Sequence, residues 1–202
     1  MIEETDTSIK AIVFDFGGVL FPIEPYSGGA TAPEERKEIT GTIQAIFHDY
    51  QDQLRAHALT IGQFKNEFVR RIKGVSGERI DIVLKSVCDP DPEMLKVIRE
   101  LDSQSQLFGL VNAPLGWTEI RRGLHRLDRY FKRIVVSHEI NIRKPNREIF
   151  EHHLKETDCE PTRALFVDDK EENLKAATAL GFRVHYFTDV RKFQDEVARL
   201  KK

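Results

Sequence analysis

Short apolar runs recur in the first part of the chain and again in its second half. These runs are apolar almost throughout, without the polar alternation of a half-exposed strand, which is typical of strands covered on both faces in a parallel sheet. The strands predicted from these runs are residues 11–14, 107–111, 134–136 and 164–167.

Amphipathic segments with the periodicity of a helix separate these runs. The predicted helices are residues 118–130, 146–157, 171–180 and 190–200. Gly181 provides a stop signal after the third of them, and residues 183–187 then read as a fifth strand. Strands alternating with helices predict an α/β fold with a doubly wound, Rossmann-like parallel sheet.

Residues 34–102 differ from the rest of the chain, because the spacing of their apolar residues predicts helices only. We expect a first helix there, a second that begins with a capping box at Thr60 and Gln63, a third capped by Ser76, and a fourth beginning at Asp91-Pro92. The apolar stripes of the first two are Ile39, Ile43, Ile46, Phe47, Tyr50 and Leu54, and then Ile61, Phe64, Phe68, Val69 and Ile72.

Each of these helices has one apolar face, so we expect the four to pack together as a helical bundle inserted into the α/β core. The Pro- and Gly-rich residues 22–33 would form the hinge that leads into it. The predicted division is a core of residues 1–21 and 104–202 and an inserted helical cap of residues 22–103.

Composition narrows the function classes without selecting one. The net charge of −2, from 31 Lys+Arg and 33 Asp+Glu, does not call for a nucleic-acid or membrane partner. No apolar run approaches the ~20 residues of a membrane span, and the acidic N-terminus does not resemble a signal peptide. Cys88 and Cys159 have no metal-binding spacing. We therefore expect a cytoplasmic protein, and its oligomeric state stays open.

Chemically capable side chains follow several of the predicted strands. Asp15 follows the first strand, Asn112 and Ala113 the second, Lys144 comes after the third, and Asp168-Asp169 follow the fourth. In open parallel sheets, ligands bind at this carboxyl edge. Carboxylates suit a hard cation such as Mg²⁺, a lysine supplies a point charge for phosphate, and backbone N–H groups can hold phosphate oxygens.

The order and spacing of these segments resemble the haloacid dehalogenase (HAD) superfamily along nearly the whole chain. The four matching segments are VFDFGGVL, GLVNAPLGW, SHEINIRKPNREIF and ALFVDDKEENLKAATALGF. The resemblance implies an HAD-like fold, and a Mg²⁺-dependent phosphatase of a small phosphorylated metabolite that works through an aspartyl-phosphate intermediate. The inserted helices would be the cap that closes over the substrate.

The same resemblance implies a role for each matching position. Asp15 and Lys144 would be catalytic, with Asp15 as nucleophile and Lys144 facing the phosphate. Asn112 and Ala113 would join Lys144 in binding phosphate, and Asn173 fits the asparagine usual after the acid pair. The metal ligands would be the carboxylates of Asp15, Asp168 and Asp169 and the backbone carbonyl of Gly17.

Two positions depart from the pattern of the active phosphatases. Gly17 stands where these enzymes usually carry a second Asp that acts as general acid, a group that contributes roughly 10²–10⁴-fold in rate. Val111 stands where they usually carry a Ser or Thr hydroxyl. These departures keep open an alternative: a catalytically weakened member that binds a ligand or partner. A metal-free 2-haloacid dehalogenase fits less well, because that branch lacks the acid pair.

Overall fold

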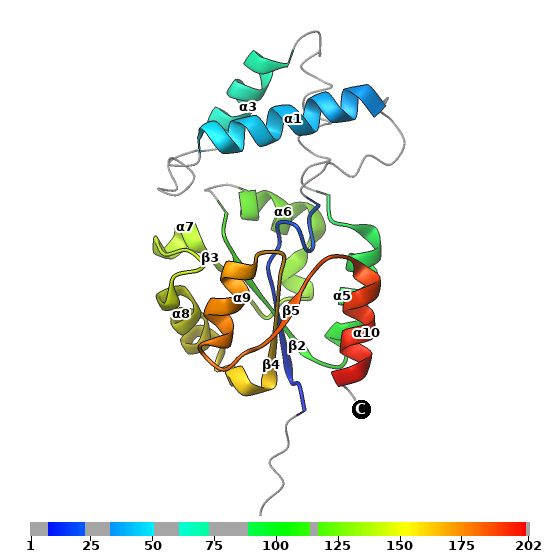
Figure 1. Ribbon diagram of the computed structural model, residues 1–202, viewed down its shortest axis with the longest axis vertical. Coiled ribbons are helices and arrows are strands. Elements are labelled where there is room, and N and C mark those ends of the chain that lie inside the picture. Colours follow the sequence, from blue (N-terminus) through cyan, green and yellow to red (C-terminus); the bar gives the residue numbers. More distant parts are fainter. Residues whose placement is uncertain (1–7, 23–32, 51–60, 73–88, 114–116, 201–202) are drawn as a thin grey trace, which may run out of the picture.

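The computed structural model describes residues 8–22, 33–50, 61–72, 89–113 and 117–200. A five-stranded sheet in the order β3-β2-β1-β4-β5 forms its centre, and all neighbouring strands are parallel. The strands are β1 (Ala11–Phe14), β2 (Gln106–Val111), β3 (Arg133–Val136), β4 (Ala164–Asp168) and β5 (Arg183–Tyr186). The parallel sheet predicted from the apolar runs is confirmed (Figure 1).

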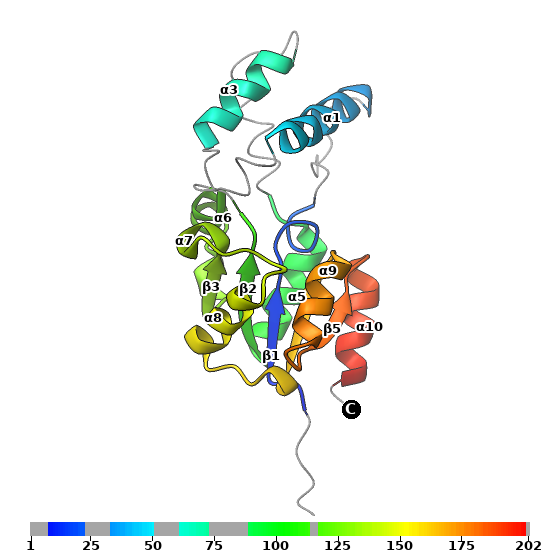
Figure 2. The ribbon, with the colours of Figure 1, turned by 60° about the vertical axis from the view of Figure 1, so that its left-hand side comes forward.

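Helices cover both faces of this sheet, as the near-continuous burial of the strands requires. Val13, Phe108 and Phe166 belong to the apolar cluster with α8 (Arg147–Thr157) and α9 (Glu171–Thr178). Ile12, Phe14 and Val167, which alternate with them, belong to the cluster on the other face. The arrows of β1, β2 and β3 point the same way in Figure 2. The other face carries α5 (Pro92–Asp102) and α10 (Val190–Leu200), which contact each other and lie side by side in Figure 1. The fold is therefore doubly wound.

Short elements complete the connections. They are α6 (Trp117–His125), the 3₁₀ turn η1 (Leu127–Arg129), α7 (Ser137–Ile140) and the 3₁₀ turn η2 (Pro161–Arg163). The helix expected over residues 118–130 ends earlier because Arg126 adopts a left-handed conformation, with φ 51°. Gly181 has φ 92°, in agreement with its predicted role as a stop after α9.

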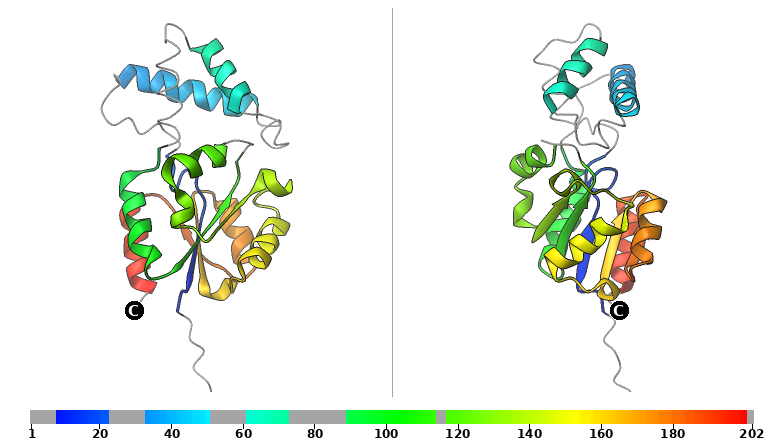
Figure 3. Two further views of the ribbon diagram at one scale, coloured as in Figure 1. Left: turned by 180° about the vertical axis from the view of Figure 1, so that it is seen from behind. Right: turned by 90° about the vertical axis from the view of Figure 1, so that its left-hand side faces the viewer.

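Two described helices of the insertion, α1 (Pro33–Asp49) and α3 (Ile61–Arg71), pack against each other. Figure 3 shows them beyond the carboxyl ends of the strands, above the sheet. Phe64 and Phe68 of the predicted apolar stripe are buried. Val69, a member of the same predicted stripe, is 46% exposed and is not part of the buried face. The third predicted helix and Thr60 lie outside the described residues.

The fourth predicted helix, α5, does not pack as expected. It contacts β2 and α10, and its apolar residues Met94, Val97, Ile98 and Leu101 belong to the cluster on that face of the sheet. The sequence stripe shows that a helix must bury one face, but it does not show against which partner. The division at residues 22 and 104 stays a prediction, although α5 covers the core sheet rather than completing a four-helix bundle.

Among the described helices, none combines the length and the apolar character that crossing a membrane requires.

Candidate active site

Asp15 directly follows β1, at the carboxyl end of the central strand. Its backbone N–H donates to the Val167 carbonyl at 2.9 Å, which continues the pairing of β1 with β4. One carboxylate oxygen accepts from the Phe16 N–H at 2.7 Å. The residue is 6% exposed, so the sheet places a buried carboxylate at its own carboxyl edge.

A tight turn follows Asp15. The Phe21 N–H donates to the Phe16 carbonyl at 2.7 Å, and the Gly18 N–H donates to the Phe21 carbonyl at 2.8 Å. Gly18 has φ 84°, and a Cβ at this position would lie 2.2 Å from Asp169 Oδ2. Only glycine combines this conformation with so close an approach. A Cβ at Gly17, by contrast, would meet no atom of the described residues within 4 Å.

The acid pair Asp168-Asp169 stands at the end of β4, and residues that follow it in the chain donate hydrogen bonds to Asp168. Asp168 is fully buried, and its oxygens accept from the Lys170 N–H at 2.9 Å and from Asn173 Nδ2 at 3.0 Å. The carboxylate of Asp169 differs from that of Asp168 in its hydrogen bonding. Within the part of the chain that the structure describes, its buried Oδ1 has no hydrogen-bond partner.

Lys144 joins the two strand ends. Its Nζ lies 2.7 Å from Asp168 Oδ2 and 3.1 Å from Asp15 Oδ1, and the residue is 1% exposed. The ammonium also lies 5.3 Å from the centre of the Phe166 ring. The structure therefore brings together the lysine and the three aspartates that the sequence placed after separate strands.

Burial and like charges shift the protonation of this cluster. Burial raises the pKa of Asp15 to about 6; the Lys144 ammonium opposes this rise, whereas the charges of Asp168 and Asp169 add to it. Burial likewise raises the pKa of Asp169, and Asp168 adds to that effect. Although burial acts to lower it, the pKa of Lys144 is raised by the Asp15 and Asp168 carboxylates.

The cluster has the composition of a site for a hard divalent cation. Asp15, Asp168 and Asp169 each offer a carboxylate oxygen, and these atoms all lie within 4.8 Å of one another. Three carboxylates face one ammonium there, an arrangement that leaves excess buried negative charge. The unpartnered oxygen of Asp169 adds a free ligand atom. The residues fit Mg²⁺, which prefers oxygen ligands.

The loop after β2 is tied to neighbouring segments. Asn112 Nδ2 donates to the Lys144 carbonyl, and Asn112 Oδ1 accepts from the Lys144 N–H, both at 2.9 Å. The Ala113 N–H donates to Ser137 Oγ at 3.2 Å. The predicted phosphate contacts of Asn112 and Ala113 stay predictions. Sequence reasoning missed the bonds between Asn112 and Lys144, since no local signal links residues 32 positions apart.

An aromatic contact joins the insertion to the core beside this loop. The Phe64 ring of α3 meets the Trp117 ring of α6 edge to face, with centroids 5.1 Å apart. The Arg121 guanidinium lies 4.3 Å from the centre of the Phe21 ring, in the turn that follows Asp15. Helix α3 is thus connected through α6 to the turn beside the buried carboxylate.

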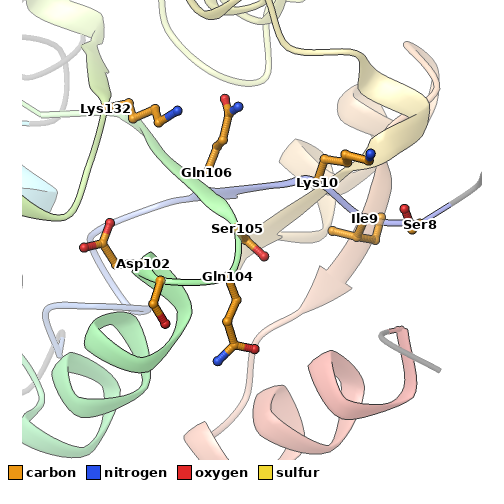
Figure 4. Close-up of a pocket in the computed structure, with 9 residues that line it drawn as sticks. Ser8, Ile9, Lys10, Asp102, Gln104, Ser105, Gln106 and Lys132 are labelled. Carbon is orange, nitrogen blue, oxygen red and sulfur yellow. The ribbon is translucent and has the colours of Figure 1, made fainter.

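An open pocket of about 550 Å³ lies at the amino ends of the strands, opposite the carboxylate cluster (Figure 4). Its lining includes Lys10, just before β1, and Ser105 and Gln106, where β2 begins. It therefore borders the amino ends of the strands, whereas Asp15 and Asp168 lie at the carboxyl ends. This pocket is separate from the carboxylate cluster.

Comparison with known proteins agrees with this geometry. The family profile of the haloacid dehalogenase-like hydrolases matches residues 9–181. The sesquiterpene phosphatase astK of Aspergillus oryzae is 30% identical over 187 residues, which cover 91% of this chain and 92% of that enzyme. A glyceraldehyde 3-phosphate phosphatase of Methanopyrus kandleri is 23% identical over 193 residues, covering 86% and 81% of the two chains.

A solved structure extends the likeness to the fold. An HAD family enzyme of Bacteroides thetaiotaomicron, in complex with magnesium and inorganic phosphate, superposes with a TM-score of 0.63 at 21% identity. The match covers 92% of this chain and 98% of that one. At this identity the likeness shows the shared fold.

Proposed function

Because the chain belongs to the haloacid dehalogenase-like hydrolase family, we propose that it is a Mg²⁺-dependent phosphatase of a small phosphorylated metabolite. The observation that carries this proposal is the cluster of Asp15, Asp168 and Asp169 around Lys144 at the carboxyl edge of the sheet. The phosphatase activities named for two relatives support the reaction class.

In this proposal, Asp15 attacks phosphorus and forms an aspartyl phosphate as the alkoxide departs and takes a proton from water. A water molecule or the hydroxide so formed then attacks the aspartyl phosphate, which releases phosphate and regenerates the carboxylate. Lys144 neutralises charge on the transferring group and holds Asp15 in place by its ion pair. Asp168 orients Lys144, and Asp15, Asp169 and the Gly17 carbonyl would hold Mg²⁺ with the charge of Asp168 beside them. A bound Mg²⁺ would supply Lewis-acid stabilisation of the phosphoryl oxygens.

The proposal includes a cytoplasmic location and a small-molecule substrate. A catalytically weakened, ligand-binding protein is the second candidate, and Gly17 and Val111 favour it because neither offers the side chain that the fast enzymes use. The two candidates differ in turnover, so one assay separates them.

The test is hydrolysis of a panel of phosphate monoesters, including glyceraldehyde 3-phosphate and a sesquiterpenyl phosphate, with Mg²⁺ or with a chelator. We expect Mg²⁺-dependent phosphate release that Asp15→Asn lowers on the order of 10³-fold or more. The matched control is Asp195→Asn, at an exposed position of α10. Equal turnover by Asp15→Asn and the wild type would exclude the aspartyl mechanism, and binding without turnover would favour the second candidate.

A further inference from the structure

The segment that carries Lys144 belongs to a connection between two strands that are not neighbours in the sheet. It connects β3, at one edge, to β4, and the strand order places β2 and β1 between them. The Lys144 ammonium nevertheless contacts Asp15 after β1 and Asp168 of β4. The Lys144 backbone must therefore be held at a fixed distance from those strand ends.

Asn112, at the carboxyl end of the intervening strand β2, makes that connection. Its carboxamide pairs with the Lys144 backbone in both directions, donating to the carbonyl and accepting from the N–H at 2.9 Å. These two hydrogen bonds run in opposite directions between Asn112 and the backbone of Lys144. Together they fix the position and the orientation of the Lys144 peptide groups. The ammonium is held at the other end of the same side chain, so Lys144 is fixed at both its backbone and its tip.

We propose that Asn112 is a positioning residue, whose carboxamide fixes the Lys144 backbone and so sets where the Lys144 ammonium lies between Asp15 and Asp168. This inference rests on the proposed phosphatase function. A lysine side chain has four flexible carbon links, and a displacement of about 1 Å in an active-site group can cost 10²-fold in rate. The backbone anchor limits that displacement.

A direct contact of the Asn112 side chain with phosphate is the competing role. Donating to phosphate would require Nδ2 to leave the Lys144 carbonyl, and that carbonyl would lose its partner. The neighbouring Ala113 N–H is engaged by the buried hydroxyl of Ser137. The observed bonds therefore assign the side chain of Asn112 to the protein rather than to the substrate.

A double-mutant cycle distinguishes the two roles. Asn112→Leu removes both bonds, and Lys144→Met removes the ammonium that they position. We expect Asn112→Leu to lower kcat on the order of 10²-fold while KM changes less than about threefold. In the Lys144→Met background we expect Asn112→Leu to have almost no further effect, because residues that act as a unit are not additive.

The matched control is Asn146→Leu, an exposed asparagine whose side chain makes no capping bond to α8; we expect unchanged kinetics. Asn112→Ala repeats the cycle without adding bulk if the leucine variant folds poorly. Losses that multiply independently in the double variant, or a rise in KM with kcat unchanged, would overturn the positioning role.

A crystal structure of the Asn112 variant separates this inference from the proposed function. We expect the Lys144 ammonium to leave its positions at 3.1 Å from Asp15 and 2.7 Å from Asp168. An ammonium that keeps both contacts would refute the inference whatever the activity. If the wild-type protein hydrolyses no phosphate ester, the proposed function fails, and this structural comparison alone decides the role of Asn112.

Discussion

The adjacent glycines Gly17 and Gly18, which follow the candidate nucleophile Asp15, differ in their steric constraints. Gly18 is required by the fold of the turn, since its φ is 84° and a Cβ would lie 2.2 Å from Asp169 Oδ2. Gly17 has no such constraint, because no atom of the described part of the chain lies within 4 Å of a Cβ built there. The missing general acid at Gly17 is therefore a chemical difference that substitution can reverse without a clash between the new Cβ and the described residues.

Gly17→Asp should raise turnover of an alkyl phosphate by about 10²–10⁴-fold, since a carboxylic acid at this point can protonate the departing alkoxide. A phenolic ester with a good leaving group should respond much less, because its leaving oxygen needs little protonation. The measurement is kcat for both esters, with Gly17→Asn as the control of similar size. An equal gain from Gly17→Asn would contradict the acid role.

Gly18→Ala should abolish activity and weaken Mg²⁺ binding, because the new methyl group displaces the Asp169 carboxylate. The left-handed backbone adds a cost of about 1–2 kcal/mol to folding. Mg²⁺ affinity by titration calorimetry and the free energy of unfolding provide the two readouts. Gly17→Ala is the neighbouring control, and comparable Mg²⁺ affinity in the two alanine variants would refute the close packing on Asp169.

At the scale of elements, an aromatic contact joins helix α3 of the insertion to helix α6 of the core. This contact can be tested by substitution. Phe64 is fully buried and its ring stands edge to face on Trp117, 5.1 Å away. Trp117 is the single tryptophan of the chain, so all of the indole fluorescence arises at this contact. The same helix leaves Val69 exposed.

Phe64→Ala should lower the free energy of unfolding by about 3–5 kcal/mol, the usual cost of removing a buried phenyl ring. It should also shift the Trp117 emission to longer wavelength, because water gains access to the indole. Chemical denaturation and the emission spectrum of the native protein measure the two effects. Val69→Ala, on the same helix, should change neither, and an unshifted Trp117 spectrum in Phe64→Ala would argue against this docking contact.

At the scale of the whole molecule, the layer between the sheet and α8 contains a buried ionisable group. His153 is fully buried against Phe108, with ring centroids 5.8 Å apart, and neither ring nitrogen has a hydrogen-bond partner among the described residues. Burial lowers the pKa of His153 to about 3, and the charges of His152 and Lys144 add to the effect. The native protein therefore keeps this imidazole neutral.

This histidine predicts a loss of stability in acid. Because the unfolded chain takes up the proton below its ordinary pKa of 6.5 and the folded protein does so only near 3, stability falls as the pH falls through that window. Two pH units below 6.5, the loss amounts to about 3 kcal/mol. His153→Leu should remove this part of the difference between unfolding at pH 7.5 and at pH 4.5.

Denaturant unfolding at the two pH values measures that difference, and His152→Leu, at the half-buried neighbouring position, is the control. An acid loss that is the same in His153→Leu and in the wild type would mean that the imidazole is already accessible to protons in the native protein.

The apolar runs predicted four parallel strands, residues 183–187 read as a fifth, and the helical periodicity between them predicted helices on both faces. These features could be predicted because a strand buried on both sides and a one-faced helix leave local patterns in the sequence. The carboxyl-edge rule then identified Asp15, Lys144, Asp168 and Asp169 as neighbours, and the structure brings these four together.

Tertiary structure alone decided the contacts that have no local pattern. The stripe of α5 is equally compatible with a helical bundle and with a sheet, and only packing selected β2 and α10. The pairing of Asn112 with Lys144 depends on strand order, which places β2 between β3 and the central strand β1. The sequence by itself thus determined the alternation of buried strands and one-faced helices, and it selected the candidate site residues. The order of the strands decided which of them meet, because proximity across a sheet depends on topology rather than on separation along the chain.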